Sequence, residues 1–407
     1  MHTTTRATGI FRAALASGVL FLVSLFGGAS AAAQPSFPGT PDGTGVNVRV
    51  YPADLWTPRV GPGVGAGFVV HNLARPNDQW LLTAAPAQHE QVATAAFASA
   101  NPQRARRYVL VNARALHTDR DWLGPASGRT VLERSSLRGR VRAGQSFLNR
   151  RALIQPHLTL THHHADAVKS PAGGPSVAAA LPAPGASQTG LRAGVDLRFD
   201  TRNQAEVTTR GVLLQATWDR YVPLDGTALR FDQVDLDAYG YVPLGGVHRL
   251  ATRLSMTLTR NRDDAPVPVY MLPTVGGAVV PGWARGRFVA ADRLLASALY
   301  RFPLLHYENL FTLDGHLGAH VAGTYDALDD QFSATVSFDE DVLPTGDSRP
   351  LRPSASAGLR FAMPEREHVS IELAAGVSPE GVSVVRFSLV RSLQSLRPAH
   401  HASENVR

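Results

Sequence analysis

The chain has 407 residues, a formal net charge of +7 at pH 7 and no cysteine, and Lys169 is its only lysine. Without cysteine the chain has neither a disulfide nor a thiol nucleophile, so a core or a closed sheet must stabilise it. Basic charge is compatible with nucleic acid. The export signal at the N-terminus instead favours contact with anionic lipid, or a surplus of solvated arginine, and argues against a nucleic-acid partner.

Residues 1–33 predict a secretory signal peptide. Arg6 and Arg12 precede an apolar stretch at 13–26, and three alanines at 31–33 form a small-residue cleavage site. We expect the mature chain to begin at Gln34 with a Pro/Gly-rich spacer over 34–62. No later segment has about 18 uninterrupted apolar residues, which argues against a helical membrane protein.

From residue 63 to 393 the chain alternates polar and apolar residues at period two, the signal of β-strands. Arg192 and Asp196, for example, share one face of a segment whose other face carries Val195 and Leu197. Strands of about ten residues with one polar and one apolar face predict an all-β fold, a transmembrane antiparallel β-barrel of about 16 strands. A soluble sandwich also alternates, but its strands are commonly shorter.

We expect strands at 63–71, 79–87, 91–98, 108–117, 130–147, 152–163, 190–200, 211–221, 233–242, 248–259, 294–302, 309–321, 352–363, 369–377 and 382–392, and residues 46–52 can supply a sixteenth. Residues 165–187 predict a long outer loop, and 394–407 a polar C-terminal tail. The segment 326–347 is rich in carboxylates, which suit calcium. Its spacing matches no calcium-binding loop, so we interpret it as a hydrated outer loop.

A glycine-rich loop precedes the strand at 294–302. Glycine lets the backbone pass close to a surface, while bulky cations and aromatics find partners there. The pattern therefore predicts a packed loop. The residues expected to pack it are Gly276, Gly277, Gly282, Trp283, Arg285, Gly286, Arg287 and Phe288.

Residues 190–211 read GLRAGVDLRFDTRNQAEVTTRG: a strand ends in Asp-x-Arg, and Thr-Arg-Gly opens the next strand. This pattern is similar to a motif of the BamA/TamA superfamily of outer-membrane barrels, also called bacterial surface antigens. YGYVPL at 239–244, the glycine-rich loop, FTLDG at 311–315 and AGLRF at 357–361 follow in the family's order. Gly211 permits a tight entry into its strand, and charged residues tie the turn. The residues of this turn motif are Asp200, Arg202, Thr209, Arg210 and Gly211.

The resemblance implies a large outer loop that folds into the barrel lumen. The family's Arg-Gly-Phe/Tyr signature in that loop is replaced here by Pro281-Gly282-Trp283. Proline offers neither charge nor donor, so Arg285 or Arg287 is expected to substitute for the missing arginine. The expected partners on the lumen wall are Asp196, Asp235, Asp237 and Asp314.

The resemblance also implies a function: assembly or translocation of proteins or lipids at the bacterial outer membrane, through a seam between the first and last strands and without a cofactor. Outer-membrane lipid and lipopolysaccharide are the expected surroundings. The family's periplasmic repeats, called POTRA domains, do not fit in 34–62, so a separately encoded periplasmic partner is expected. The alternative is a passive pore for small solutes.

Two clusters carry possible chemistry. His162, His163 and His164 suggest zinc, but consecutive residues of a strand point to opposite faces, so we predict no metal site. A less favoured alternative is an enzyme at the barrel rim that uses Asp314, His316 and His320. Those residues share one face of a strand. A polar lumen-facing row, which every such strand must have, is the better explanation of them, so no catalytic residue is predicted.

Overall fold

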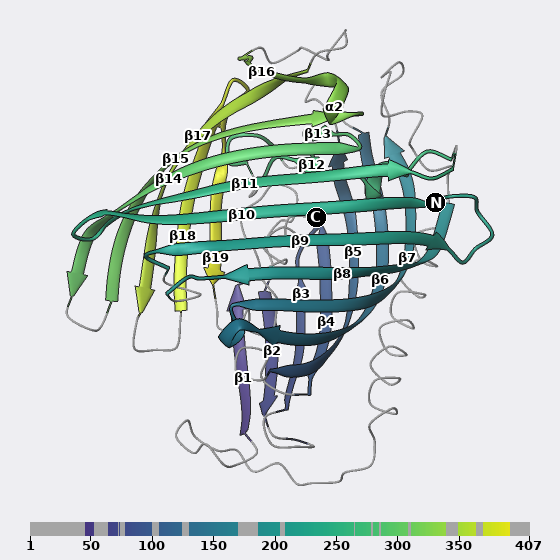
Figure 1. Ribbon diagram of the computed structural model, residues 1–407, viewed down its shortest axis with the longest axis horizontal. Coiled ribbons are helices and arrows are strands. Elements are labelled where there is room, and N and C mark those ends of the chain that lie inside the picture. The colour runs from purple at the N-terminus through teal and green to yellow at the C-terminus, as the bar shows by residue number, and fades with distance from the viewer. Residues whose placement is uncertain are drawn as a thin grey trace.

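In a computed structural model, the structure describes residues 45–52, 64–71, 73, 78–99, 106–123, 130–169, 186–203, 208–263, 265–277, 280–284, 286–307, 311–338, 349–363 and 369–390. Most of these residues lie in β-strands, and Figure 1 shows the strands side by side as one strongly curved wall. Among the described residues, none of the helices combines the length and the apolar character that crossing a membrane requires.

The wall is a 17-stranded sheet. Sixteen strands form an antiparallel meander in which each pairs with the next along it. They are β1 (Gly45–Pro52), β2 (Val64–His71), β3 (Gln79–Pro86), β4 (Glu90–Ala98), β5 (Arg107–Leu123), β6 (Thr130–Phe147), β7 (Ala152–Lys169), β8 (Ala186–Asp200), β9 (Gly211–Pro223), β10 (Phe231–Gly245), β11 (His248–Asn261), β14 (Asp292–Tyr307), β15 (Phe311–Tyr325), β17 (Arg349–Met363), β18 (Val369–Ser378) and β19 (Gly381–Val390).

The remaining elements are short. The segment between β11 and β14, called here the lumen loop, contains η4 (Val269–Met271) and a two-stranded hairpin of β12 (Thr274–Val275) and β13 (Phe288–Val289). Elsewhere lie η2 (Leu148–Arg150), α2 (Leu328–Gln331) and β16 (Phe332–Val336), which pairs in parallel with β17. We call the end of the barrel at which the lumen loop emerges the loop end, and the opposite end, where β8 turns into β9, the turn end.

The side chains of the wall alternate as the sequence predicts. On β7, Leu158 and Leu160 are 53% and 50% exposed on the outer surface, whereas the alternating residues His157, Thr159 and Thr161 are buried inside. An apolar exterior over a polar interior suits a lipid environment, because the paired strands satisfy one another's backbone groups and apolar side chains meet the hydrocarbon. The fold is thus the predicted antiparallel transmembrane β-barrel with a large loop folded inward.

The wall is uneven in height. Strands β5 to β8 have 15 to 18 residues, whereas β1 to β4 have only 8 or 9 and β18 and β19 have 10 each. β17 begins at Arg349, but its pairing with β18 begins only at Ala355. The short strands therefore form the first and last parts of the meander. β18 stops short of the loop end, which β17 reaches.

Residues 46–52, named as a possible sixteenth strand within the expected spacer 34–62, lie in β1, which pairs with β2 along eight residues. Two other sequence expectations need correction. The acidic segment 326–347 is not only loop, because it contains α2 and β16. The outer loop expected at 165–187 is shorter, since β7 continues to Lys169 and β8 begins at Ala186. The predicted signal peptide and the C-terminal tail lie outside the described residues.

Candidate functional site

The tip of the lumen loop crosses the last hairpin, β18–β19, at very close range. The Ser378 hydroxyl donates a hydrogen bond to the carbonyl oxygen of Gly282, at 2.8 Å. Gly282 has a φ of 107°, and a Cβ atom added to it would lie 2.6 Å from the carbonyl oxygen of Val377. A Cβ atom on Gly376 would lie 2.1 Å from the Gly282 nitrogen. Two backbones can approach this closely only because both positions are glycine.

An ion pair and an aromatic cluster fix the same contact. Arg287 is buried and pairs with Glu380, which occupies the turn between β18 and β19. The guanidinium groups of Arg287 and Arg352 lie 4.8 Å and 4.2 Å from the ring centre of Phe288. Trp283 is 1% exposed and meets Phe288 edge-on at 5.1 Å. The loop is therefore attached to the barrel wall by charge, by cation–π contacts and by apolar packing.

The stem of the lumen loop is attached to the opposite wall. The Tyr270 hydroxyl donates to Gln188 on β8, at 3.1 Å, and its ring packs against His163 of β7 at 5.5 Å. Arg134 on β6 donates to the Tyr270 carbonyl at 3.4 Å. Burial raises the pKa of Tyr270 to about 12, so the phenol stays protonated and remains a donor. The loop thus contacts both β6–β8 and β17–β19 across the lumen.

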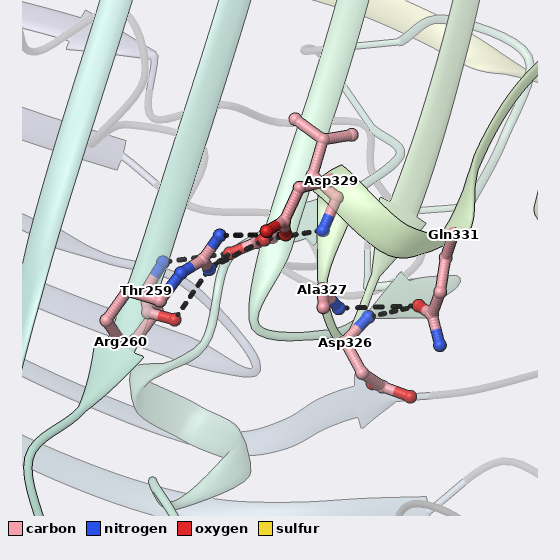
Figure 2. A network of polar contacts seen from close by, with 8 residues as sticks. Thr259, Arg260, Asp326, Ala327, Asp329 and Gln331 are labelled. Atoms are coloured by element: carbon pink, nitrogen blue, oxygen red, sulfur yellow. Dashed lines mark hydrogen bonds and ion pairs between the residues drawn. The ribbon is translucent and has the colours of Figure 1, made fainter.

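At the loop end, Asp292 joins three segments, and Figure 2 shows part of this network. Its fully buried carboxylate accepts bonds from Arg260 at 2.6 and 2.7 Å. It also accepts from the backbone N–H groups of Thr259, at 3.0 Å, and of Leu328, at 2.9 Å. Asp292 therefore joins the end of β11, the start of β14 and α2. These contacts fix both ends of the lumen loop, where it leaves β11 and where it enters β14.

The partner of Arg287 differs from those expected. We expected Asp196, Asp235, Asp237 or Asp314, but the carboxylate that pairs with Arg287 is Glu380, 93 residues further along the chain. Within the barrel wall, Asp196 lies beside Arg140, Arg142 and His157, Asp235 accepts from Thr257, Asp237 pairs with Arg253, and Asp314 stands in register with Arg360. Each of these carboxylates faces a neighbouring strand. Arg285, the other expected substitute, lies outside the described residues.

The remaining residues of the predicted loop set lie as follows. Gly276, Gly277 and Gly286 have φ values of 120°, 64° and 74°, in the region that favours glycine. The Gly277 amide donates to the Trp283 carbonyl at 2.7 Å, which closes the tip of the loop on itself. These glycines therefore shape the loop, and Gly282 is the one that allows contact with the wall.

Hydrogen bonds of Asp200, Arg202 and Asn203 close the turn between β8 and β9. The Asp200 carboxylate accepts from the backbone amide and from the guanidinium of Arg202, at 3.1 and 2.9 Å. Gly211 has a φ of 114°, and a Cβ there would lie 2.6 Å from the Thr201 carbonyl. Sequence reasoning missed Asn203, whose side-chain oxygen accepts from the backbone N–H groups of Thr209 and Arg210. An Asn two residues after a strand-ending Asp–Thr was the available signal.

The histidine run at 162–164 is divided between the two faces of β7. His162 and His164 face outward and contact Thr189 and Ser187, whereas His163 faces inward. His320 uses both ring nitrogens for contacts with Ser297 and Ser356, each at 2.9 Å. Within the described part of the chain, no group of three or more His, Asp or Glu side chains is arranged to hold a metal ion.

These features define a class of protein: a transmembrane β-barrel of outer-membrane type whose lumen contains a long, fastened loop. Comparison with solved structures agrees. The fold is similar to that of BamA from Haemophilus ducreyi lacking POTRA domains 1–3, with a TM-score of 0.60, 13% identity and coverage of 85% of this chain and 69% of that one. It is also similar to CdiB from Escherichia coli, with a TM-score of 0.55, 11% identity and coverage of 87% of this chain and 62% of that one.

At sequence identities of 13% and 11%, the similarity to these two structures shows the fold alone. No family model matches the sequence. No curated protein matches it either.

Proposed function

We propose that this protein is an outer-membrane barrel of the BamA/TamA type that assembles or translocates proteins or lipids at the bacterial outer membrane. The observation that carries the proposal is the attachment of the lumen loop to the last hairpin of the wall, through Gly282, Arg287, Ser378 and Glu380. A loop fixed across the lumen to the last hairpin leaves less room for a wide, open pore. The turn motif of 200–211 and the fold likeness support the same assignment.

The short strands give the proposed mechanism a physical basis. A strand of eight residues, rising about 3.3 Å each and tilted by about 45°, spans roughly 19 Å, whereas the apolar band of such barrels is about 25 Å tall. The bilayer would have to thin beside the shortest strands, β1–β3, at a cost of a fraction of a kcal/mol per Å. We place insertion of cargo at this seam, where lipid order is weakest, and no covalent chemistry is involved.

The test of the assignment combines conductance with a cellular measurement. Refolded protein in planar bilayers should give small, flickering currents, and a variant lacking residues 276–288 should give large, steady ones. The matched control is Arg287→Glu, which keeps the loop but breaks its attachment and should give intermediate, fluctuating currents. In the source bacterium, loss of the gene should lower the amount of particular folded outer-membrane or secreted proteins, measured by quantitative proteomics of heat-modifiable species.

The competing function is a passive channel, and the polar lumen favours it: Gln155, Asp196 and Gln233 are all buried inside the wall. Large steady currents from the intact protein, together with an unchanged surface proteome, would establish a passive channel. The proposed function would then be wrong, although the fold would stand. Lipopolysaccharide around the barrel and a separately encoded periplasmic partner are part of the proposal. Crosslinking in intact cells, followed by identification of the attached protein, tests the partner.

A further inference from the structure

An apolar hollow of about 520 Å³ lies on the outer surface of the barrel, over the strands β7 to β11 and β14, which pair in this order (Figure 1). The leucine side chains that line it are exposed, as lipid-facing residues are. Its volume falls within the range of small-molecule sites, about 300 to 1,000 Å³. We call it the outer hollow; the outward-facing residues that shape it are Leu197, Leu214, Ala216, Leu236, Ala238 and Leu254.

The register of the strands explains why the hollow forms. In one cross-strand row, Ala216 on β9 stands between Leu197 of β8 and Leu236 of β10. In the next row, Ala238 on β10 likewise stands between a leucine of β9 and a leucine of β11. An alanine side chain ends at its Cβ atom, whereas a leucine side chain projects further from the sheet. Each alanine therefore leaves a gap between two leucines, and the two gaps adjoin.

The outer hollow runs obliquely through the lipid-facing surface. It begins beside Ala152 and Phe199, at the turn end of β7 and β8, and reaches Leu294 on β14. The path from β7 to β14 crosses five strand spacings of about 4.8 Å, or roughly 24 Å. Because the strands of such barrels are tilted by about 45°, this path rises by roughly 17 Å. One leaflet contains hydrocarbon to a similar depth, about half of the 30 Å core. The hollow therefore suits an acyl chain that enters from the turn end.

Two exposed arginines stand at the turn end, next to the start of the hollow. Arg151 immediately precedes Ala152, and its carbonyl accepts from the Asp200 amide at 2.7 Å, which places it beside the end of β8. Arg210 stands just before the first residue of β9. The nearby carboxylate, Asp200, pairs with Arg198. A guanidinium presents planar pairs of donors that match phosphate oxygens. Positive charge therefore stands at the level where a lipid headgroup would lie.

We propose that the outer hollow holds one acyl chain of a phospholipid from the leaflet at the turn end. Arg151 binds the phosphate of this lipid, and Arg210 adds positive charge at the same level. The chain fills the gaps above Ala216 and Ala238, where it gains contacts that a void would forfeit. This lipid is retained by the barrel while the surrounding lipid exchanges. The inference requires a barrel that spans a membrane and is independent of any role in assembly or translocation.

The direct test uses the full chain refolded in a non-ionic detergent, with phosphatidylglycerol as the probe and native mass spectrometry as the readout. The hollow-filling variant is Ala216→Leu/Ala238→Leu. Its matched control is Ala319→Leu/Ala355→Leu, which makes the same change at two exposed alanines that stand in register on β15 and β17. Heat-modifiable migration on gels confirms that each variant has folded.

We expect wild type to retain one phosphatidylglycerol per barrel. The hollow-filling variant should bind it at least about tenfold more weakly, because the added leucine side chains occupy the place of the acyl chain. The control should change by about twofold or less. Should the double variant not fold, Ala238→Leu alone provides the same comparison. Equal loss in the hollow-filling variant and the control, or no retained lipid on wild type, would overturn the proposal.

The phosphate contact is tested with Arg151→Gln/Arg210→Gln. Its control, Arg106→Gln/Arg107→Gln, removes two exposed arginines at the start of β5, at the same end of the barrel and with the same change in net charge. The first variant should bind phosphatidylglycerol about threefold more weakly, and the control should match wild type. Equal weakening in both would show attraction to net charge alone and overturn the contact. A barrel dimer in place of the bound lipid would assign the hollow to a second copy of the chain and overturn the proposal.

Discussion

The tall wall of β5–β8 and the low wall formed by β1–β4 with β18–β19 are built from the same alternating pattern but differ in how they are stabilised. In the tall wall, strands of 15 to 18 residues pair with one another along almost their whole length. In the low wall, strands of 8 to 10 residues form fewer ladder bonds. The lumen loop adds a hydrogen bond and an ion pair to β18–β19 from the lumen side. A short wall next to the seam therefore depends on a tertiary contact that a long wall does not need.

The largest effect is expected from the ion pair that attaches the loop to the low wall. Arg287→Glu places two carboxylates together in a buried site and should destabilise the barrel by about 3 kcal/mol, since breaking a buried pair leaves an uncompensated charge. The double variant Arg287→Glu/Glu380→Arg should recover much of that loss. The measurement is the unfolding midpoint in neutral detergent, and Arg210→Glu, at an exposed site, is the control. An equally low unfolding midpoint for the swapped variant would show that the ion pair between Arg287 and Glu380 does not stabilise the barrel.

The glycine crossing is expected to come next. Gly376→Ala would place a Cβ 2.1 Å from the Gly282 nitrogen, so the loop tip must move away and about 2 kcal/mol should be lost. The control is Gly139→Ala on the tall wall, where an added Cβ meets nothing within 4 Å. That variant should change stability by no more than about 0.5 kcal/mol. Similar losses at both glycines would mean that the two walls do not differ as described.

A smaller, local effect is expected at Asp292. Asp292→Asn keeps one acceptor but loses the charge that holds Arg260 and two backbone amides, for a cost of about 1 kcal/mol, since Arg260 is half exposed. The visible result should be faster proteolysis at both feet of the lumen loop, mapped by mass spectrometry. Asp329→Asn, whose carboxylate is exposed and 3.5 Å from Arg260, should leave cleavage unchanged. Equal cleavage of both variants would contradict the role assigned to Asp292.

The smallest effect concerns the lipid. If the low wall sets the hydrophobic height near the seam, refolding should be more efficient in bilayers of short-chain than of long-chain phosphatidylcholine, because mismatch costs a fraction of a kcal/mol per Å. Hydrogen exchange should locate the difference in β1–β4 and β18–β19, with β5–β8 unaffected. Uniform exchange across both regions in both lipids would show that strand length does not govern the local membrane thickness.

The turn between β8 and β9 shows how far local sequence reaches. Asp200, Arg202 and Gly211 lie within twelve residues of one another, so the hydrogen bonds and the positive φ that they require are local properties, and both were predictable. The alternation of His157 and Thr159 with Leu158 likewise placed each residue on the correct face of the sheet, because a strand has a period of two.

The first strand and the acidic segment were harder to predict. β1 is short and follows a Pro/Gly-rich stretch, and its pairing with β2 is what makes it a strand. β16 likewise owes its place to β17, its parallel neighbour. Short extended segments depend on a partner strand for their hydrogen bonds, so their own residues give a weak signal.

The sequence by itself determined where most strands lie, the two faces of the wall and the tight turn, because these follow from periodicity and from neighbours within a few residues. Only the tertiary structure decided that Arg287 meets Glu380, that Gly282 crosses Gly376, and that Arg114 faces Arg138. Each of these contacts joins residues on different strands or loops. It depends on strand register and barrel curvature, which the chain sets collectively through pairing and which no single segment encodes.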